Sequence, residues 1–434
     1  MKGTYKNGLF RSARFYCFIV TLAFVVGLVP IVFNLVVDPY EMDEFVDTGL
    51  EKQKISEKAH YPLWKVIHYP ENSPNVVILG DSRARSLRDK YWHDLGAQNA
   101  YNFAYGGATI YEIYDTFKYV KKNSDLKALV IGIQLRSFNL QFKNGQNRVP
   151  EAIRLSQNPL KYYSNWFVSR IGLRLLQKEI KPWLPQLTEL GWGITSSAQA
   201  ESLAKTKVGQ IEGLIERKVC DECMLPENYA ASVHPSNTLS TPHYFANHLG
   251  IWGDLWPRGK IDRKLVGNFK RQVSRNGKAD WRSFEFSNKF WRYLMEISAW
   301  SKQNKVQLIF VIPPTIVEMQ RRIYEFGYGK LNHELRGRLA NLGIVVDFDF
   351  DSPLTRNVTR FTDAYHFDYK AARLIVGEIV QLANEENGSV ALARKRRKDI
   401  ICPILEKDVS SRIANDNMEV LEGHSCRIWR VLDG

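Results

Sequence analysis

Five short apolar runs, separated by segments with helical patterning, constrain the fold of this chain more than any other feature. Each run is rich in aliphatic or aromatic residues and has the length of a buried strand. Strands and helices that alternate in this way predict an α/β fold, with a parallel sheet covered by helices on both faces. The expected strands are Asn75–Leu79, Asn99–Thr109, Leu126–Ile133, Lys305–Pro313 and Gly343–Asp349.

Helical patterning follows most of these runs. Thr109 and Glu112 have the spacing of a capping box, which predicts a helix from there to about Lys122. The strand–helix rhythm stops between about 136 and 280, so we interpret this stretch as an insertion, helical in part over Arg170–Ile180. The other expected helices are Ser86–Leu95, Phe284–Asn304, Ile316–Leu342 and a last one from Tyr369.

The N-terminal region indicates the compartment. Residues Phe15–Val37 form a stretch of 23 residues without a charge, long enough to span a bilayer. The residues before it are basic and those just after it are acidic, which predicts a cytoplasmic N-terminus. A cleaved signal peptide would have a shorter apolar region and a small-residue cleavage site. We therefore expect a single-pass inner-membrane protein with its main domain in the periplasm, or otherwise outside the cytoplasm.

The charge of the chain points to an anionic partner. The formal net charge is +14, and outside the cytoplasm this favours acidic polysaccharide or lipid head groups over nucleic acid. Five cysteines are present, and Cys220 and Cys223 form a lone C-x-x-C that we interpret as a local disulfide or two unrelated thiols. We expect no metal site and no cofactor.

These observations divide the chain into seven parts. They are a basic cytoplasmic flank (1–14), a transmembrane anchor (15–37), a stalk and lead-in segment (38–74), the first part of the α/β domain (75–142), the insertion (143–283), the second part of the domain (284–386) and a basic, disordered tail (387–434).

Candidate catalytic residues follow three of the expected strands. Ser82 comes directly after the first one, and Asp363 and His366 lie three residues apart after the fifth. The carboxyl ends of parallel strands meet at one edge of a sheet, where ligands bind. A serine becomes nucleophilic when a histidine takes its proton, and a carboxylate orients that histidine. The backbone N–H groups of Ser82 and of Gly106 or Gly107, after the second strand, are expected to hold an oxyanion.

These residues resemble the SGNH, or GDSL-type, hydrolase superfamily. Its first block is matched by Gly80-Asp81-Ser82, its second by Gly106 or Gly107, and its last, Asp-x-x-His, by Asp363–His366. The resemblance covers about residues 75–142 and 284–385. It implies a three-layer, flavodoxin-like fold with about five parallel strands, and a Ser82–His366–Asp363 triad that needs no metal.

Two positions depart from the superfamily. Its third block is usually Gly-x-Asn-Asp, whose Asn joins the oxyanion hole, whereas this chain has Gly132 followed by Gln134 and Leu135. The third donor is therefore sought in Asn139, with Gln134 and Arg136 as alternatives, because losing one donor costs about 100- to 1000-fold in rate. Arg83 replaces a leucine, and either binds a substrate carboxylate or phosphate or pairs with Asp81 or Glu112.

The anchor, the insertion and the altered third block look like the cell-envelope branch of the superfamily, which is similar to alginate O-acetylation proteins and the D-alanyl-teichoic-acid transfer protein. This implies a serine acyl esterase or O-acyltransferase for an envelope or exported polysaccharide, working beside a membrane-bound O-acyltransferase. Two alternatives stay open. One is a non-catalytic polysaccharide-binding or assembly protein, in which Ser82→Ala keeps function. The other is an esterase that acts on lipids.

Overall fold

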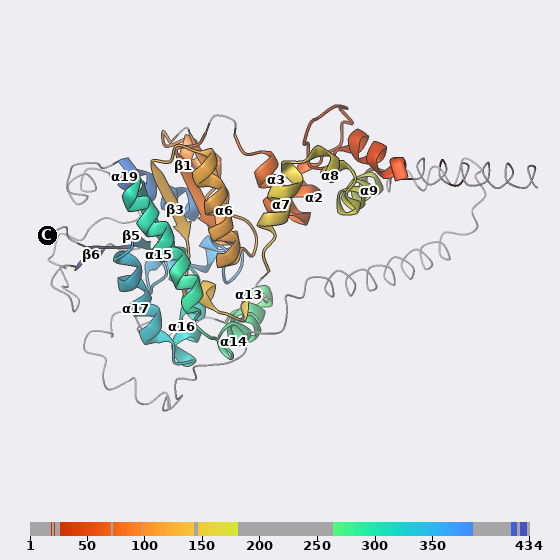
Figure 1. The fold of residues 1–434 in the computed structure, drawn as a ribbon. Coiled ribbons are helices and arrows are strands. Elements are labelled where there is room, and N and C mark those ends of the chain that lie inside the picture. Colours follow the sequence, from red (N-terminus) through yellow and green to blue (C-terminus); the bar gives the residue numbers. More distant parts are fainter. Residues whose placement is uncertain are drawn as a thin grey trace, which may run out of the picture.

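The chain folds into a mixed α/β structure around a mostly parallel sheet (Figure 1). The computed structural model describes residues 19, 21, 27–70, 73–97, 99–142, 146–180, 264–384, 418–422 and 426–431. The sheet order is β2-β1-β3-β4-β5-β7-β6. The strands are β1 (Val76–Gly80), β2 (Ala100–Asn102), β3 (Ala128–Gly132), β4 (Gln307–Ile312), β5 (Ile344–Asp347), β6 (Met418–Glu422) and β7 (Arg427–Val431).

All five strands expected from the sequence are present and parallel to their neighbours. Their order, 2-1-3-4-5, is that of flavodoxin-like doubly wound sheets. In such sheets the strand order reverses between β1 and β3, and ligands bind outside the carboxyl ends of the strands at that point. The prediction of a five-stranded parallel sheet is therefore confirmed, and its first and third strands define the place to look for a site.

The C-terminal tail was wrongly predicted to be disordered throughout. Within it, β6 and β7 pair antiparallel with each other, and β7 pairs antiparallel with β5. An uncovered β5 would present unpaired backbone groups at the edge of the sheet, and the hairpin satisfies them. Cys426, next to β7, is disulfide-bonded.

Helices cover both faces of the sheet, as predicted. Alternate side chains of the strands enter two separate apolar cores. One core contains side chains from α6 (Ile110–Asn123) and α15 (Asn288–Gln303), and the other contains side chains from α5 (Asp89–His93) and α19 (Tyr369–Asn384). The capping box at the start of α6 is present, with Thr109 and Glu112 bonded reciprocally.

Two of the predicted helices are interrupted. The segment expected as one helix over Ile316–Leu342 forms α16 (Val317–Glu325) and α17 (Gly329–Ala340). Gly327 lies between them with φ of +83°, a left-handed conformation that ends helices and that glycine adopts readily. The helix expected over Ser86–Leu95 instead begins at the nucleophile candidate, as α4 (Ser82–Arg85), and resumes as α5.

The first part of the insertion packs against the N-terminal segment. The segment 38–74 contains α2 (Gln53–Ala59) and α3 (Tyr61–Ile67), and α3 lies against α7 (Val149–Ser156). Next along the chain come α8 (Pro159–Tyr163) and α9 (Trp166–Ile180). The hydroxyl of Tyr162 donates to Asp38 Oδ1 at 2.7 Å, and both side chains are buried. The segment expected as a stalk and lead-in thus contains two helices, and it packs against the insertion.

The last part of the insertion returns to the α/β domain. It consists of α13 (Gly267–Arg271), a π-helical turn η3 (Gln272–Asn276) and α14 (Gly277–Trp281), which lies against α16. Cys220 and Cys223 lie outside the described residues.

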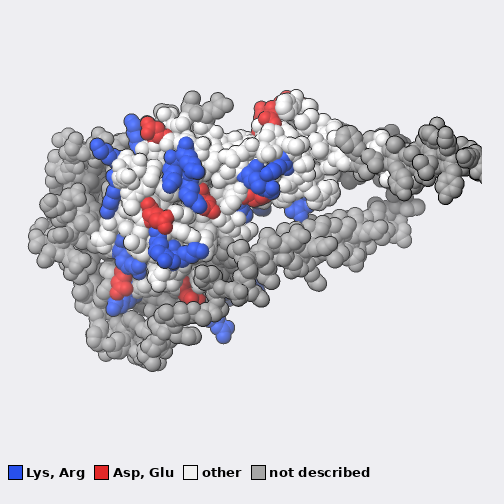
Figure 2. All heavy atoms as spheres, in the orientation of Figure 1, with Lys and Arg blue, Asp and Glu red and all other residues white. Residues whose placement is uncertain are grey.

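Residues 27–37 are helical and end at the border of the predicted anchor. Most of the anchor's earlier residues lie outside the described part of the chain, and no helix within that part is long and apolar enough to cross a membrane. On the face of the molecule in Figure 2, Lys and Arg side chains are interspersed with Asp and Glu and do not form one continuous basic patch.

Candidate active site

The structure brings Ser82, His366 and Asp363 together at the carboxyl edge of the sheet. Ser82 Oγ lies 2.8 Å from His366 Nε2. His366 Nδ1 lies 2.8 Å from Asp363 Oδ2 and 2.9 Å from its Oδ1. An ionised carboxylate only accepts hydrogen bonds, so Nδ1 carries the proton and Nε2 is free to accept from the serine hydroxyl. The arrangement is that of a nucleophile, a base and an orienting acid.

Asp363 is held by the loop that it helps to form. Its Oδ1 accepts hydrogen bonds from the backbone N–H of Tyr365 at 2.8 Å and of His366 at 3.0 Å. Burial acts to raise the pKa of Asp363, but the hydrogen bonds from His366 and from the backbone outweigh it and lower the pKa to about 2. The carboxylate is therefore ionised near neutral pH, as its orienting role requires.

Small residues let the nucleophile's helix lie directly on the strand ends. Gly80 and Gly132 are paired in register at the ends of β1 and β3, and Ala84 of α4 packs on both. A Cβ at Gly132 would lie 2.5 Å from that of Ala84, and a Cβ at Gly80 2.6 Å from it. Gly80 also has φ of +143°. Gly132, the part of the third block that this chain retains, thus makes room for the turn that carries Ser82.

The loop after β2 supplies candidate oxyanion donors. The expected strand Asn99–Thr109 ends at Asn102, so Gly106 and Gly107 lie in a loop at the same edge as Ser82. The backbone N–H groups of Ser82, Gly106 and Gly107 donate no hydrogen bond to any group in the described part of the chain. These three groups are therefore available to a ligand.

The turn at Gly106 is held in place by Tyr61 and Arg148. A Cβ at Gly106 would lie 2.9 Å from the ring of Tyr61, and the Gly106 carbonyl accepts from Arg148 Nη2 at 3.3 Å. Arg148 is in turn paired with the buried Glu112 at 2.7 Å. Tyr61 precedes the α/β domain and Arg148 begins the insertion, so both added parts of the chain support the loop.

The side chain of Asn139, predicted as the third donor, is hydrogen-bonded to backbone groups of the protein. Its Nδ2 donates to the carbonyl of Asp280 at 3.4 Å, and its Oδ1 accepts from the N–H groups of Gln141 and Glu285 at 3.1 and 3.3 Å. The amide thus joins the third-block loop to the end of the insertion. By contrast Gln134, one of the alternatives, has a buried Nε2 without a hydrogen-bond partner in the described structure.

Arg83 pairs with Asp81, which is one of the two pairings expected from the sequence. Its Nη2 lies 2.7 Å from Asp81 Oδ2, it also donates to Gln134 Oε1, and its side chain is 1% exposed. Burial acts to raise the pKa of Asp81, but Arg83 and Arg136 outweigh it and hold that pKa below its usual value. Arg83 is thus buried beneath the nucleophile, which does not support the predicted contact with substrate.

Sequence reasoning missed Asp280 and Tyr365. Asp280 Oδ2 accepts from Tyr365 Oη at 2.8 Å and from Arg136 Nη1 at 3.1 Å. The Arg136 guanidinium lies 4.9 Å from the centre of the Tyr365 ring. Tyr365 is the residue directly before His366. The backbone N–H of Ala364 also donates to Gln272 Oε1 at 2.7 Å. The end of the insertion therefore holds the loop that carries the triad's base, and no local signal in the sequence marks these partners.

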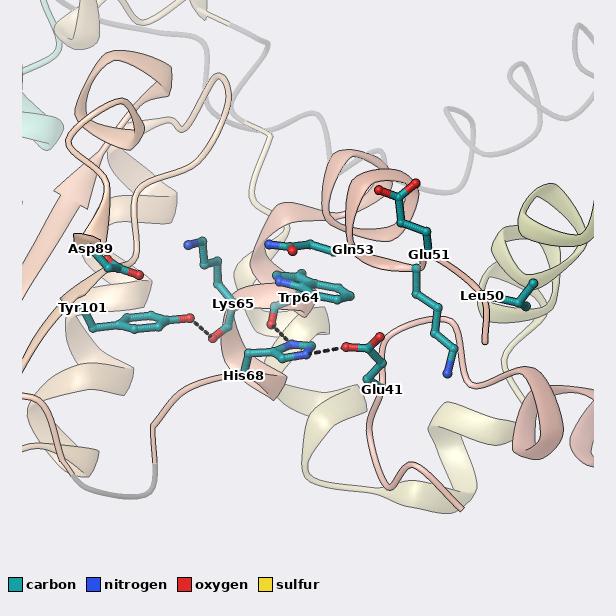
Figure 3. A pocket seen from close by; sticks show the side chains of 10 residues that line it. Glu41, Leu50, Glu51, Gln53, Trp64, Lys65, His68, Asp89 and Tyr101 are labelled. Carbon is teal, nitrogen blue, oxygen red and sulfur yellow. Dashed lines mark hydrogen bonds and ion pairs between the residues drawn. The ribbon is translucent and has the colours of Figure 1, made fainter. Parts of the chain in front are cut away.

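A hollow lies beside α3, away from the triad (Figure 3). Its volume is about 500 Å³, and Trp64, Lys65 and Tyr101 are among the residues that line it. All three of its acidic residues are already bonded, Glu41 to His68 at 3.2 Å, Glu51 to Lys178 at 2.9 Å and Asp89 to the backbone N–H of Asn102 at 2.5 Å. No residue of the triad or of the Gly106 turn lines this hollow.

In the part of the chain that the structure describes, no three His, Cys, Asp or Glu side chains are grouped to hold a metal ion. Comparisons of the sequence with models of known protein families and with curated proteins found no match.

Proposed function

We propose that this protein is a membrane-anchored serine acyl esterase or O-acyltransferase of the SGNH type, acting on an envelope or exported polysaccharide. The observation that carries the proposal is the chain of hydrogen bonds from Ser82 through His366 to Asp363. It lies where β1 and β3 end in a sheet of order 2-1-3-4-5, which is the ligand-binding edge of such sheets.

The chemistry follows from the positions of the three side chains. Ser82 Oγ attacks the carbonyl carbon of an acyl ester while His366 Nε2 takes the hydroxyl proton. Asp363 stabilises the imidazolium that forms, and the N–H groups of Ser82, Gly106 and Gly107 receive the oxyanion. The tetrahedral intermediate then loses the alcohol, which takes the proton from His366. This leaves an acyl-serine and a neutral histidine.

The acyl-serine is resolved by a second hydroxyl. Water or a sugar hydroxyl loses its proton to His366 as it attacks, and the proton returns to Ser82 when the carboxylic acid or the new sugar ester is released. Water as acceptor makes the protein an esterase, and a sugar hydroxyl makes it an O-acyltransferase. In the second case the acyl donor is an ester or thioester supplied at the membrane, as by a membrane-bound O-acyltransferase.

Two observations support a position outside the cytoplasm. Residues 15–37 carry no charge and follow a basic flank, which is typical of an anchor with a cytoplasmic N-terminus. Cys426 is disulfide-bonded, which is typical of proteins in oxidising compartments. A periplasmic position of a chain with net charge +14 suits an acidic polysaccharide as substrate and argues against nucleic acid as a partner.

The proposal is tested by following the acyl group. The purified full-length protein is mixed with a chromogenic acetyl ester, with or without an acidic oligosaccharide, and the protein and sugar are analysed by mass spectrometry. We expect an acetyl adduct on Ser82, and its transfer to sugar or water identifies the acceptor. Ser82→Ala is expected to form no adduct.

The two alternatives from the sequence predict other outcomes of the same experiment. A polysaccharide-binding protein would bind the oligosaccharide equally well as wild type and as the Ser82→Ala variant, and neither form would carry an adduct. A lipid esterase would form the adduct from acyl lipids but not from acetylated glycans. Either result would replace the proposed function.

A further inference from the structure

The helix α9 has apolar side chains on two opposite faces. Val168, Ile171 and Leu175 are buried against the protein. On the opposite side, Trp166, Leu173 and Ile180 are 64%, 44% and 47% exposed. These three positions are seven residues apart, and seven residues make almost two full turns of a helix, so they form one stripe along it. The helix already buries its other face, so the exposed apolar stripe indicates a second contact, with another protein or with a membrane.

The position of α9 is fixed by the end of the predicted anchor. Asn34 is fully buried, and its Nδ2 donates to the carbonyls of Tyr163 at 2.6 Å and Asn165 at 3.2 Å, at the junction of α8 and α9. Gly172, in the middle of α9, faces Phe33 and Val37, and a Cβ there would lie 2.9 Å from the Phe33 ring. The last turn of the uncharged segment is therefore packed directly on α9.

The opposite face of this last stretch is apolar and exposed. Leu28, Val29, Val32, Leu35 and Val36 are between 36% and 62% exposed. Residues 27–37 carry no charged side chain, and they lie on the side of the described molecule where α8 and α9 lie (Figure 1). If the anchor spans the bilayer and ends at Val37, the helix packed on its final turn lies at the depth of the membrane surface.

The composition of α9 suits that depth. The exposed stripe begins with Trp166, at the N-terminal end of the helix. Tryptophan is enriched at the membrane–water boundary, and Trp and Leu on one face are typical of helices that lie in the plane of the interface. Three apolar side chains do not make a helix that spans a bilayer. They can insert into the membrane interface when the neighbouring anchor already holds the chain at the membrane.

We propose that the exposed stripe of α9 inserts into the outer leaflet of the membrane that holds the anchor, and that it fixes the orientation of the domain above the bilayer. This inference rests on the membrane anchoring in the proposed function, but not on the serine chemistry. The occupant of the stripe is the lipid acyl-chain boundary.

Photo-crosslinking in the native membrane tests whether the stripe of α9 contacts lipid. The full-length chain carries benzoylphenylalanine at position 173, or at 166 as a second variant, and the control carries it at the exposed Met295 of α15. After irradiation, adducts are identified by mass spectrometry. We expect lipid adducts at 173 and 166 that are at least tenfold more abundant than at 295.

Each other outcome overturns the proposal. Adducts at 173 with another protein, with a second copy or with a different peptide of this chain would show that protein covers the stripe. Equal lipid labelling at 173 and 295 would show that the stripe faces solvent. Extraction of the protein by alkaline carbonate would refute the anchor, whereas labelling of Ser82 in the same samples reports on the serine chemistry independently.

Discussion

At the scale of single residues, Arg83 has either a structural role, in its buried pair with Asp81, or a role in binding substrate. The stability of a variant distinguishes the two. Arg83 and Asp81 are both buried and bonded at 2.7 Å. Removing one member of such a pair leaves an uncompensated charge, so Arg83→Leu is expected to lower the free energy of unfolding by about 3–5 kcal/mol. Chemical denaturation measures this loss.

The matched control for that variant is Arg154→Leu. Arg154 is paired with Glu151 on the surface, and exposed pairs contribute about 0–1 kcal/mol. Unchanged stability of Arg83→Leu, together with an increased KM, would instead assign Arg83 to the substrate.

Asp363 offers a prediction about rate. Asp363→Asn keeps the size of the side chain but presents an amide to His366, which favours the wrong tautomer for a base. We expect formation of the acyl-enzyme to slow by about 10⁴-fold. Stopped-flow measurement of the first turnover checks this, and a loss of less than tenfold would remove Asp363 from the triad.

The same carboxylate predicts a pH dependence of stability. The pKa of Asp363 is about 2 in the folded protein, below the value of about 3.9 of an unperturbed aspartate. Its contribution to stability is therefore complete above about pH 4 and disappears as the pH falls through about 2. The Tm difference between wild type and Asp363→Asn should therefore fall between about pH 4 and pH 2. A difference that is unchanged across that interval would contradict the lowered pKa.

At the scale of elements, the contact between α4 and the strand ends decides how precisely Ser82 is placed. Gly132→Ala would add a Cβ 2.5 Å from that of Ala84, and overpacking of this kind typically costs about 1–3 kcal/mol. We expect that destabilisation in urea unfolding, together with slower acylation because the turn that carries Ser82 is displaced.

Gly377→Ala is the control for this contact. Gly377 lies inside α19, and a Cβ there would have no neighbour closer than 4.0 Å. Alanine is favoured over glycine in a helix by about 0.8–1 kcal/mol, so this variant is expected to be as stable as wild type or more so. A similar loss of unfolding free energy in both variants would show that the contact between α4 and the strand ends does not cause the destabilisation of Gly132→Ala.

Elements that depend on local sequence were predictable, and those that depend on distant partners were not. The five parallel strands and the capping box of α6 follow from apolar runs and from a Thr–Glu spacing. The hairpin β6–β7 pairs with the edge of β5, far away in the chain. An isolated two-stranded hairpin is marginally stable at best, and these short strands carry little signal of their own. The break between α16 and α17 depends on one glycine in an otherwise helical pattern.

The candidate site divides in the same way. Ser82, Asp363 and His366 follow expected strands, so the rule for parallel sheets placed them at one edge. The bonds of the Asn139 amide to backbone at the far end of the insertion could not be predicted, because those groups are about 140 residues away in sequence. Asp280 was missed because its partners, Arg136 and Tyr365, are 144 and 85 residues away in sequence.

At the scale of the whole molecule, the insertion and the triad are mechanically joined through Asp280. Asp280→Asn would weaken the bonds to Arg136 and Tyr365 and so loosen the loop that holds His366. We expect about a tenfold slower reaction at Ser82, which corresponds to about 1.4 kcal/mol in the barrier. Tyr365→Phe removes one hydrogen bond only and should have a smaller effect. Equal rates for wild type and both variants, all folded by near-UV circular dichroism, would show that the insertion does not position the triad.

The central claim is that Ser82 is an activated nucleophile. The most direct measurement treats the full-length protein with an acyl-phosphonate probe and locates the adduct by mass spectrometry, with Ser82→Ala and His366→Ala as controls. We expect labelling at Ser82 that is absent in both variants, because the first lacks the nucleophile and the second lacks its base. Folded wild-type protein that does not react, or labelling that survives in His366→Ala, would contradict the account.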